Sequence, residues 1–301
     1  MVERLRLAWF RWGLRTAIGL LWWGRKTRGL SVSDERVAVA GGRIRLRVYC
    51  PQGEAPFPVI LYFHGGGWIA GDLDTHDAVC RDLCAHARHL VVAVDYRRAP
   101  EHPFPIPIED CLFSLQWVKE HAARLGGDPG HLTLCGDSAG GNLAAVVAQQ
   151  ARQTHPGLIK GQILVYPVTD HCRHAHWPSY AAYGGRGYSL PLYSLPLKGM
   201  MEMWDLYLRG SPLWTPGMRR HDLATPLHTC DLTGLSRTLL ILAEQDLLHD
   251  EGAEYARLLR QSGVAVEVRE YPGTQHGFFG FKPSPAYRQA IGDVAAWVRA
   301  A

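Results

Sequence analysis

The chain has 301 residues, which is long enough to bury a full core and accommodates one large α/β domain or two smaller ones. Hydrophobic residues make up 47% of the sequence and charged residues 20%, and this composition excludes disordered, collagen-like and coiled-coil proteins. The net charge of +4 arises in residues 1–30, which hold seven basic residues and one acidic residue, so the near-neutral remainder offers no general surface for nucleic acid.

The first segment, residues 1–36, is basic, rich in tryptophan and predicted to be helical. One helical face would consist of Leu5, Trp9, Trp12, Leu20 and Trp23, with Arg4, Arg11 and Arg15 along its flank. A second apolar face would consist of Leu7, Phe10, Leu14, Ile18 and Leu21. A secretory signal fits poorly because the apolar stretch is short and lacks a small-x-small cleavage site. The sequence also contains no run of 18 uncharged apolar residues, which a membrane-spanning helix would need.

Two interpretations of this helix remain open. It packs on the body of the protein and buries both apolar faces, or it lies in a membrane interface with tryptophan at the headgroups and arginine facing anionic lipid.

From Val37 onward, short β-branched runs alternate with longer helical stretches, and we expect a core domain over residues 37–301. Val37–Ala40 and Ile44–Val48 predict a hairpin. Later strands are predicted at Val59–Phe63, Leu90–Val94, Leu132–Leu134, Gln162–Val165, Thr238–Leu242 and Ala265–Arg269. Helices are predicted at Asp74–Arg88, Ile108–Leu125, Ala139–Arg152, Glu251–Gln261 and Ala286–Arg299. This alternation predicts an α/β fold with parallel strands and right-handed crossovers.

About 70 residues without a clear strand separate Val165 from Thr238. They are rich in aromatic side chains: Trp177, Tyr180, Tyr183, Tyr188, Tyr193, Trp204, Tyr207 and Trp214. Because long loops inside a compact domain usually cover a site, we expect a cap inserted at about residues 172–225, completed by the N-terminal helix. The depth of the pocket beneath it is expected to depend on Trp177, Tyr183, Tyr188 and Trp204.

The segment Gly136-Asp137-Ser138-Ala139-Gly140 has the form G-x-S-x-G between a predicted strand and a predicted helix. In that context the serine occupies a strained turn, where the flanking glycines have no side chain to collide. The helix that follows directs its first N–H groups at a developing anion. Ser138 is therefore the candidate nucleophile.

The segment His64–Gly67 follows another buried strand and contains three successive glycines. Such a turn can present backbone N–H groups to an oxyanion, and the N–H of Ala139, after the nucleophile, is a further donor site. A phosphate cradle would require a lysine or the pattern G-x-x-x-x-G-K, and neither is present.

A serine needs a base and an orienting acid to act as a nucleophile. Among 15 histidines, His276 lies in a loop after the last predicted strand, in the chain order Ser…Asp…His. Asp246 follows the preceding strand and is favoured as the acid. Asp250 is the alternative, with an N-cap as its ordinary structural role.

Together these motifs resemble the hormone-sensitive-lipase-like carboxylesterases (bacterial family IV) of the α/β-hydrolase superfamily. The resemblance extends from about Val37 to the C-terminus and includes Asp95–Glu101, Asp246–Glu251 and His276-Gly-Phe. It departs from the family pattern where the usual Asp-Pro-Leu reads Asp246-Leu-Leu, and where the usual Tyr-Arg-Leu-Ala-Pro reads Tyr96-Arg-Arg-Ala-Pro.

The resemblance implies an α/β-hydrolase fold, a mostly parallel eight-stranded sheet flanked by helices with a helical cap. It implies Ser138 as nucleophile, His276 as base and Asp246 as its partner. It places the oxyanion donors at Gly65, Gly66 and Ala139.

No cofactor or metal is expected. His76, Cys80 and Cys84 lie at intervals of four on one helix and span about 12 Å, too far to converge on one ion. The cluster His171, Cys172, His174 and His176 is interpreted as a solvated loop. The seven cysteines are odd in number and scattered, which favours a reducing compartment.

The sequence therefore predicts a serine hydrolase that cleaves carboxylic esters with short-to-medium acyl chains through an acyl-enzyme intermediate. The alternatives are a membrane-surface lipase acting on lipid esters and a non-catalytic ligand receptor on a hydrolase scaffold. The partner is a small-molecule ester and not nucleic acid. A peripheral membrane contact through residues 1–30 and a homodimer stay open. The expected location is the cytoplasm, with the inner face of the membrane as the candidate contact.

Overall fold

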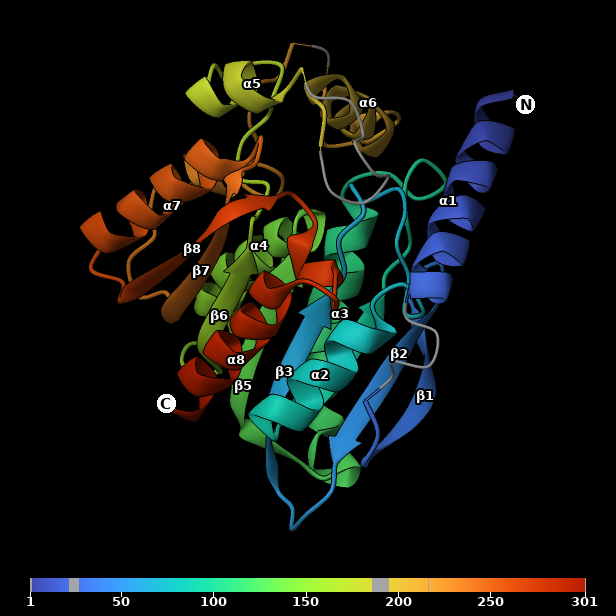
Figure 1. Ribbon diagram of the computed structural model, residues 1–301, viewed down its shortest axis with the longest axis vertical. Helices are drawn as coiled ribbons and strands as arrows, with labels where there is room; N and C mark the ends of the chain where they lie inside the picture. Colours follow the sequence, from blue (N-terminus) through green and yellow to red (C-terminus); the bar gives the residue numbers. More distant parts are fainter. Residues whose placement is uncertain (1, 22–26, 186–194, 216, 301) are drawn as a thin grey trace.

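The computed structural model describes residues 2–21, 27–185, 195–215 and 217–300. One sheet of eight strands, in the order β1-β2-β4-β3-β5-β6-β7-β8, forms its centre (Figure 1). Strand β2 runs antiparallel to both neighbours, and every other adjacent pair is parallel. The strands are β1 (Leu30–Val39), β2 (Gly42–Pro51), β3 (Phe57–Phe63), β4 (Leu90–Asp95), β5 (Gly127–Asp137), β6 (Ile159–Val165), β7 (Arg237–Gln245) and β8 (Val266–Gln275). The predicted α/β-hydrolase sheet is confirmed.

Helices cover both faces of the sheet because successive strand residues point to opposite sides. On one face, α2 (Asp77–Ala87) and α8 (Pro285–Arg299) pack on residues such as Ile60 and Tyr62. On the other, α3 (Ile106–His121), α4 (Ala139–Thr154) and α7 (His249–Gln261) pack on residues such as Val59 and Leu61. Strand β3 is thus buried on both sides, as its unbroken apolar run requires.

The N-terminal hairpin is longer than predicted. Strand β1 begins at Leu30, which pairs with Pro51, so residues 30–36 are strand and not part of a helical segment. The stretch Ser31-Val-Ser-Asp-Glu-Arg36 is mostly polar because β1 lies at the edge of the sheet. Because this stretch lacks an apolar alternation, no sequence pattern predicts this part of the strand.

Helix α1 (Val2–Leu21) buries most of one apolar face, although Phe10 on that face is 41% exposed, and leaves the other face exposed. Leu7 is buried, and Leu14 and Ile18 pack against the core. The opposite face is exposed: Leu5 by 55%, Trp9 by 68%, Trp12 by 61% and Leu20 by 70%. Burial of both faces is therefore wrong for the described part of the helix, while Leu21 and Trp23 lie outside the side chains described. Among the described residues, no helix has the length and apolarity that a bilayer crossing requires.

Two helices, α5 (Pro178–Tyr183) and α6 (Leu197–Leu208), and the short η2 (Pro226–His228) lie in the connection between β6 and β7. Figure 1 shows α5, α6 and α1 on the same side of the sheet, beyond the carboxyl ends of the parallel strands. Ligands of open α/β sheets bind at that edge.

Candidate active site

The turn between β5 and α4 places Ser138 in a strained conformation. Its φ is 55° and its ψ is −120°, values that an L-residue adopts only under local constraint. A Cβ atom on Gly136 would lie 2.2 Å from the carbonyl oxygen of Gly140, and one on Gly140 would lie 2.0 Å from that of Phe63. Only glycine fits at these two positions, so the sequence-based explanation of this turn matches its geometry.

Three candidate residues far apart in the chain meet at the carboxyl ends of β5, β7 and β8. The Nε2 atom of His276 lies 2.9 Å from the Oγ atom of Ser138. The Nδ1 atom of His276 lies 2.7 Å from Oδ2 of Asp246, whose other oxygen accepts the N–H of Leu248 at 3.0 Å. The Asp246 side chain is fully buried. The imidazole therefore bridges the hydroxyl and the carboxylate.

The alternative acid, Asp250, belongs to a different contact. Its carboxylate accepts the backbone N–H of Ser179 in α5 at 2.8 Å and contacts His249 at 2.8 Å. Asp250 therefore ties the segment between β6 and β7 to α7, while Asp246 is the carboxylate beside His276.

The glycine-rich loop after β3 has a left-handed backbone at three consecutive residues. The φ angles are 119° at Gly66, 61° at Gly67 and 59° at Trp68. The N–H of Gly65 donates to Oδ1 of Asp137 at 3.0 Å. Because that N–H already has a carboxylate partner, the assignment of Gly65 as an oxyanion donor is wrong. Gly66 and Gly67 line the pocket beside Ser138 and donate no backbone hydrogen bond within the described part of the chain.

The side chain of Asp137 fixes this loop by hydrogen bonding, a role that the sequence did not reveal. Its buried carboxylate accepts the Tyr62 hydroxyl at 2.6 Å and the Gly65 N–H, and lies 3.4 Å from Nε2 of His76. Burial raises the pKa of Asp137, but the charge of His76 and the hydrogen bonds outweigh it and leave the pKa below its usual value. The signal for this role is an ionisable residue at the variable position of G-x-S-x-G.

The glycine-rich loop also packs against α6 through Trp68. The indole of Trp68 is fully buried and stacks on Tyr207 with ring centres 4.3 Å apart and planes 5° apart. The ring of Trp204 also packs against the Trp68 indole, with ring centres 4.5 Å apart. The segment between β6 and β7 thus fixes the loop that carries Gly66 and Gly67.

A cavity of about 160 Å³ opens at Ser138 and His276. Its apolar wall comes from α1 and from the segment around α6: Phe10, Leu14, Ile18, Leu195 and Met203. Trp177, Tyr183 and Trp204 do not line it, so their expected control of pocket depth is wrong, and Tyr188 lies outside the described residues. Trp204 instead packs beneath the surface against Trp68.

The described residues contain no group of three side chains that could hold a metal ion. His171 and Cys172 are buried, and the His171 ring stacks on Trp204 and Trp214. The interpretation of this cluster as a solvated loop is therefore wrong for these two residues, since His171 belongs to an aromatic cluster and Cys172 to the hydrophobic core.

The chain is similar in sequence and in overall structure to known esterases. A family profile described as alpha/beta hydrolase fold matches residues 60–280. Carboxylesterase NlhH of Mycobacterium tuberculosis is 40% identical over 260 residues, which cover 85% of this chain and 78% of NlhH. Ethyl acetate hydrolase of Pseudomonas putida is 37% identical over 253 residues, which cover 82% of this chain and 75% of the hydrolase. The crystal structure of EstE1, a thermostable carboxylesterase cloned from a metagenomic library, matches with a TM-score of 0.90 at 37% identity, covering 98% of this chain and 97% of EstE1.

Proposed function

The chain belongs to the hormone-sensitive-lipase-like carboxylesterases of the α/β-hydrolase fold and hydrolyses carboxylic esters, and within this activity we propose that Ser138 is the nucleophile, His276 the general base and Asp246 the residue that orients the base. The observation that supports these roles is the continuous chain of contacts, 2.9 Å from Ser138 to His276 and 2.7 Å from His276 to Asp246.

The reaction then proceeds by two acyl transfers. His276 accepts the Ser138 proton as Oγ attacks the ester carbonyl, and the imidazolium gives that proton to the departing alcohol. The carboxylate of Asp246 keeps Nδ1 protonated, so that Nε2 is the basic atom facing Ser138. Water activated by the same Nε2 then attacks the acyl-enzyme and releases the acid.

For the oxyanion we propose the N–H groups of Gly66, Gly67 and Ala139, with Gly65 excluded by its bond to Asp137. Ala139 is the first residue of α4, so its N–H has no partner within the helix. A hole formed from backbone donors stabilises the tetrahedral intermediate without reorganisation, and each donor is worth about 10²–10³ in rate.

The small catalytic cavity supports esters with short-to-medium acyl chains as substrates, under a cap formed by α1, α5 and α6. The name of the P. putida relative, ethyl acetate hydrolase, points the same way. The test is a panel of p-nitrophenyl esters of graded acyl length. We expect kcat/KM to be greatest for short and medium chains; activity that increases steadily to the longest chains would contradict this substrate class.

A fluorophosphonate probe separates an esterase from a non-catalytic ligand receptor. The probe labels an activated serine, so wild-type protein should be labelled and Ser138→Ala should not. Equal labelling of both proteins, or of neither, would contradict the proposed nucleophile.

A second candidate, action on lipid esters at a membrane surface, is supported by the outer face of α1. Four large apolar side chains of that face are mostly exposed, although the opposite face of the same helix lines the catalytic cavity. Residues 1–30 carry a strong positive charge, which complements the anionic inner face of a bacterial membrane. All seven cysteines are unpaired, which fits a reducing compartment.

Vesicle cosedimentation tests this contact with the double variant Trp9→Ser/Trp12→Ser. A matched control, Phe113→Ser/Leu213→Ser, removes two exposed apolar side chains outside α1. We expect only the tryptophan variant to lose binding to vesicles that contain phosphatidylglycerol. If the wild-type protein does not bind these vesicles but forms a dimer, and the tryptophan variant is monomeric, the outer face of α1 contacts a second copy of the chain. That result would contradict the membrane contact.

A further inference from the structure

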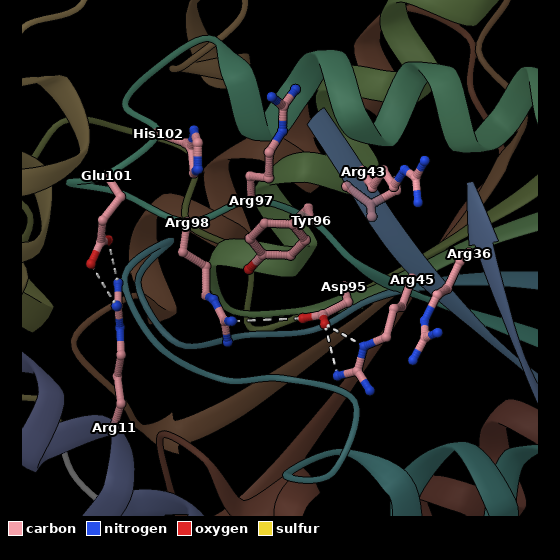
Figure 2. Close-up of a pocket in the computed structure, with 11 residues that line it drawn as sticks. Arg11, Arg36, Arg43, Arg45, Asp95, Tyr96, Arg97, Arg98, Glu101 and His102 are labelled. Carbon is pink, nitrogen blue, oxygen red and sulfur yellow. Dashed lines mark hydrogen bonds and ion pairs between the residues drawn. The ribbon is translucent and has the colours of Figure 1, made fainter. Parts of the chain in front are cut away.

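A second cavity, of about 460 Å³, lies outside the catalytic centre, between the β1–β2 hairpin, α1 and the loop after β4. Figure 2 shows that its walls are dominated by guanidinium groups. Six arginines line it: Arg11, Arg36, Arg43, Arg45, Arg97 and Arg98. Asp95 and Glu101 are the only carboxylates among its described lining residues, so the cavity carries excess positive charge.

Half of these arginines are held by strong pairs within the protein. Arg11 donates to both oxygens of Glu101, at 2.9 and 2.8 Å. Arg97 is bound to the buried Asp110, with its closest contact at 2.7 Å. Arg45 donates through two nitrogens to Asp95, at 3.2 and 3.0 Å. These pairs engage Glu101, Asp110 and Asp95, and the neighbouring Asp34 is bound by Arg47 at 2.7 Å. The remaining arginine of the cavity, Arg98, donates to the carbonyl oxygen of Gly71.

Arg36 and Arg43 have no such partner. Both are exposed, and neither makes a hydrogen bond or an ion pair with any residue in the described part of the chain. The hairpin also places like charges together, since Arg36 pairs directly across the strands with Arg45, and Arg43 lies two residues from Arg45 on the same face. Like charges directly opposite each other destabilise a hairpin. A bound anion would remove this repulsion.

We propose that this cavity binds a phosphate group, held mainly by Arg36 and Arg43. A phosphate carries up to two negative charges, and planar guanidinium groups bind its oxygens through paired hydrogen bonds. The site acts independently of ester hydrolysis, because none of its arginines lines the catalytic cavity.

The phosphate has two candidate sources, a soluble phosphate compound or a lipid headgroup. Arg11 connects the cavity to α1, where it precedes Trp12 on the exposed apolar face. A headgroup in the cavity would therefore lie beside a helix whose outer side chains suit the acyl region of the same membrane.

The test compares wild-type protein with Arg36→Gln/Arg43→Gln. The matched control is Arg257→Gln/Arg269→Gln, which removes the same charge from exposed positions on α7 and on β8, the opposite edge of the sheet. Binding is measured by calorimetry with inorganic phosphate and glycerol phosphate, and by cosedimentation with vesicles of phosphatidylcholine alone or with phosphatidylglycerol. Turnover of p-nitrophenyl butyrate should be equal in all three proteins, so a failure here is distinct from a failure of the proposed triad.

We expect the Arg36/Arg43 variant to bind phosphate about 25-fold more weakly, since each arginine near an anionic group contributes about fivefold, while the control binds like wild type. Loss confined to the vesicles identifies a lipid headgroup, and loss confined to calorimetry identifies a soluble phosphate compound. Equal binding by all three proteins, an equal loss in the control, or no binding by wild type would overturn the proposal.

Discussion

The catalytic centre and the outer side of the N-terminal hairpin and helix differ in whether their side chains find partners within the protein. At the centre, Asp137 and Asp246 each accept backbone and side-chain donors, and neither is exposed. On the outer side, Trp9 faces solvent and Arg36 lacks a partner among the described residues. A site complete within the chain is organised in advance for one reaction. The outer surface, whose groups lack such partners among the described residues, is where we propose the membrane contact and the phosphate site.

The largest expected effect lies at the centre. Asp246→Asn should lower kcat about 10⁴-fold, because an amide cannot stabilise the imidazolium and favours the wrong tautomer of His276. Asp250→Asn is the matched control and should change kcat by only a few-fold. Steady-state kinetics on a short p-nitrophenyl ester would measure both. A greater loss in the Asp250 variant would move the acid to that residue and erase the contrast between the two aspartates.

A second prediction concerns the contact between α5 and α7. Glu251 in α7 is fully buried and accepts the N–H of Thr169 at 2.7 Å and the hydroxyl of Tyr180 in α5. Burial raises its pKa from 4.5 to about 8. The folded state therefore binds the proton more tightly than the unfolded state, so this contribution to stability is complete below pH 4.5 and is lost as the pH rises to about 8.

Glu251→Gln should remove this pH dependence and retain more stability at pH 9 than wild type, by on the order of a few kcal/mol. Urea unfolding at pH 5 and pH 9 measures the free energy of unfolding for both proteins. Parallel pH profiles in wild type and variant would show that Glu251 titrates normally. In that case the buried contact between α5 and α7 would not depend on the protonation of Glu251.

The smallest expected effect separates the two faces of α1. Phe10 and Met203 line both the catalytic cavity and a neighbouring groove of about 480 Å³ between α1 and α6. Phe10→Ala should open the cavity toward that groove and raise kcat/KM for long acyl chains, relative to short ones, by about tenfold. Trp9→Ala, on the outer face, should leave this ratio on soluble esters unchanged. An equal change of this ratio in both variants would contradict the prediction that only the inner face of α1 shapes the catalytic cavity.

The sequence predicted the parts of the molecule that obey local rules. The strand–turn–helix around Ser138 follows from two glycines that no other residue could replace, and the strands follow from unbroken apolar runs such as Val59–Phe63. The chain order of Ser138, Asp246 and His276 then limited the choice of partners. The glycines and the apolar runs each lie within a few residues of the position they predict, and the chain order needs no knowledge of the fold.

The errors arose where tertiary contacts decide. The donor at Gly65 is occupied by Asp137, a residue 72 positions away, and no local pattern reveals which glycine N–H faces the pocket. The apolar wall of the cavity comes from α1 and from residues around α6 and not from the tryptophans between β6 and β7, because Trp204 packs on Trp68. Helix α1 has two apolar faces in sequence, but only the fold determines that Leu7 is buried and Trp9 is exposed.

The most direct measurement of the central claim is mass spectrometry of the covalent adduct. Protein treated with a fluorophosphonate is digested, and the modified peptide is sequenced. We expect one adduct, on Ser138, formed at the wild-type rate in Asp250→Asn and far more slowly in Asp246→Asn and His276→Ala. An adduct on another residue, or labelling of Ser138 that is indifferent to the loss of His276, would contradict it.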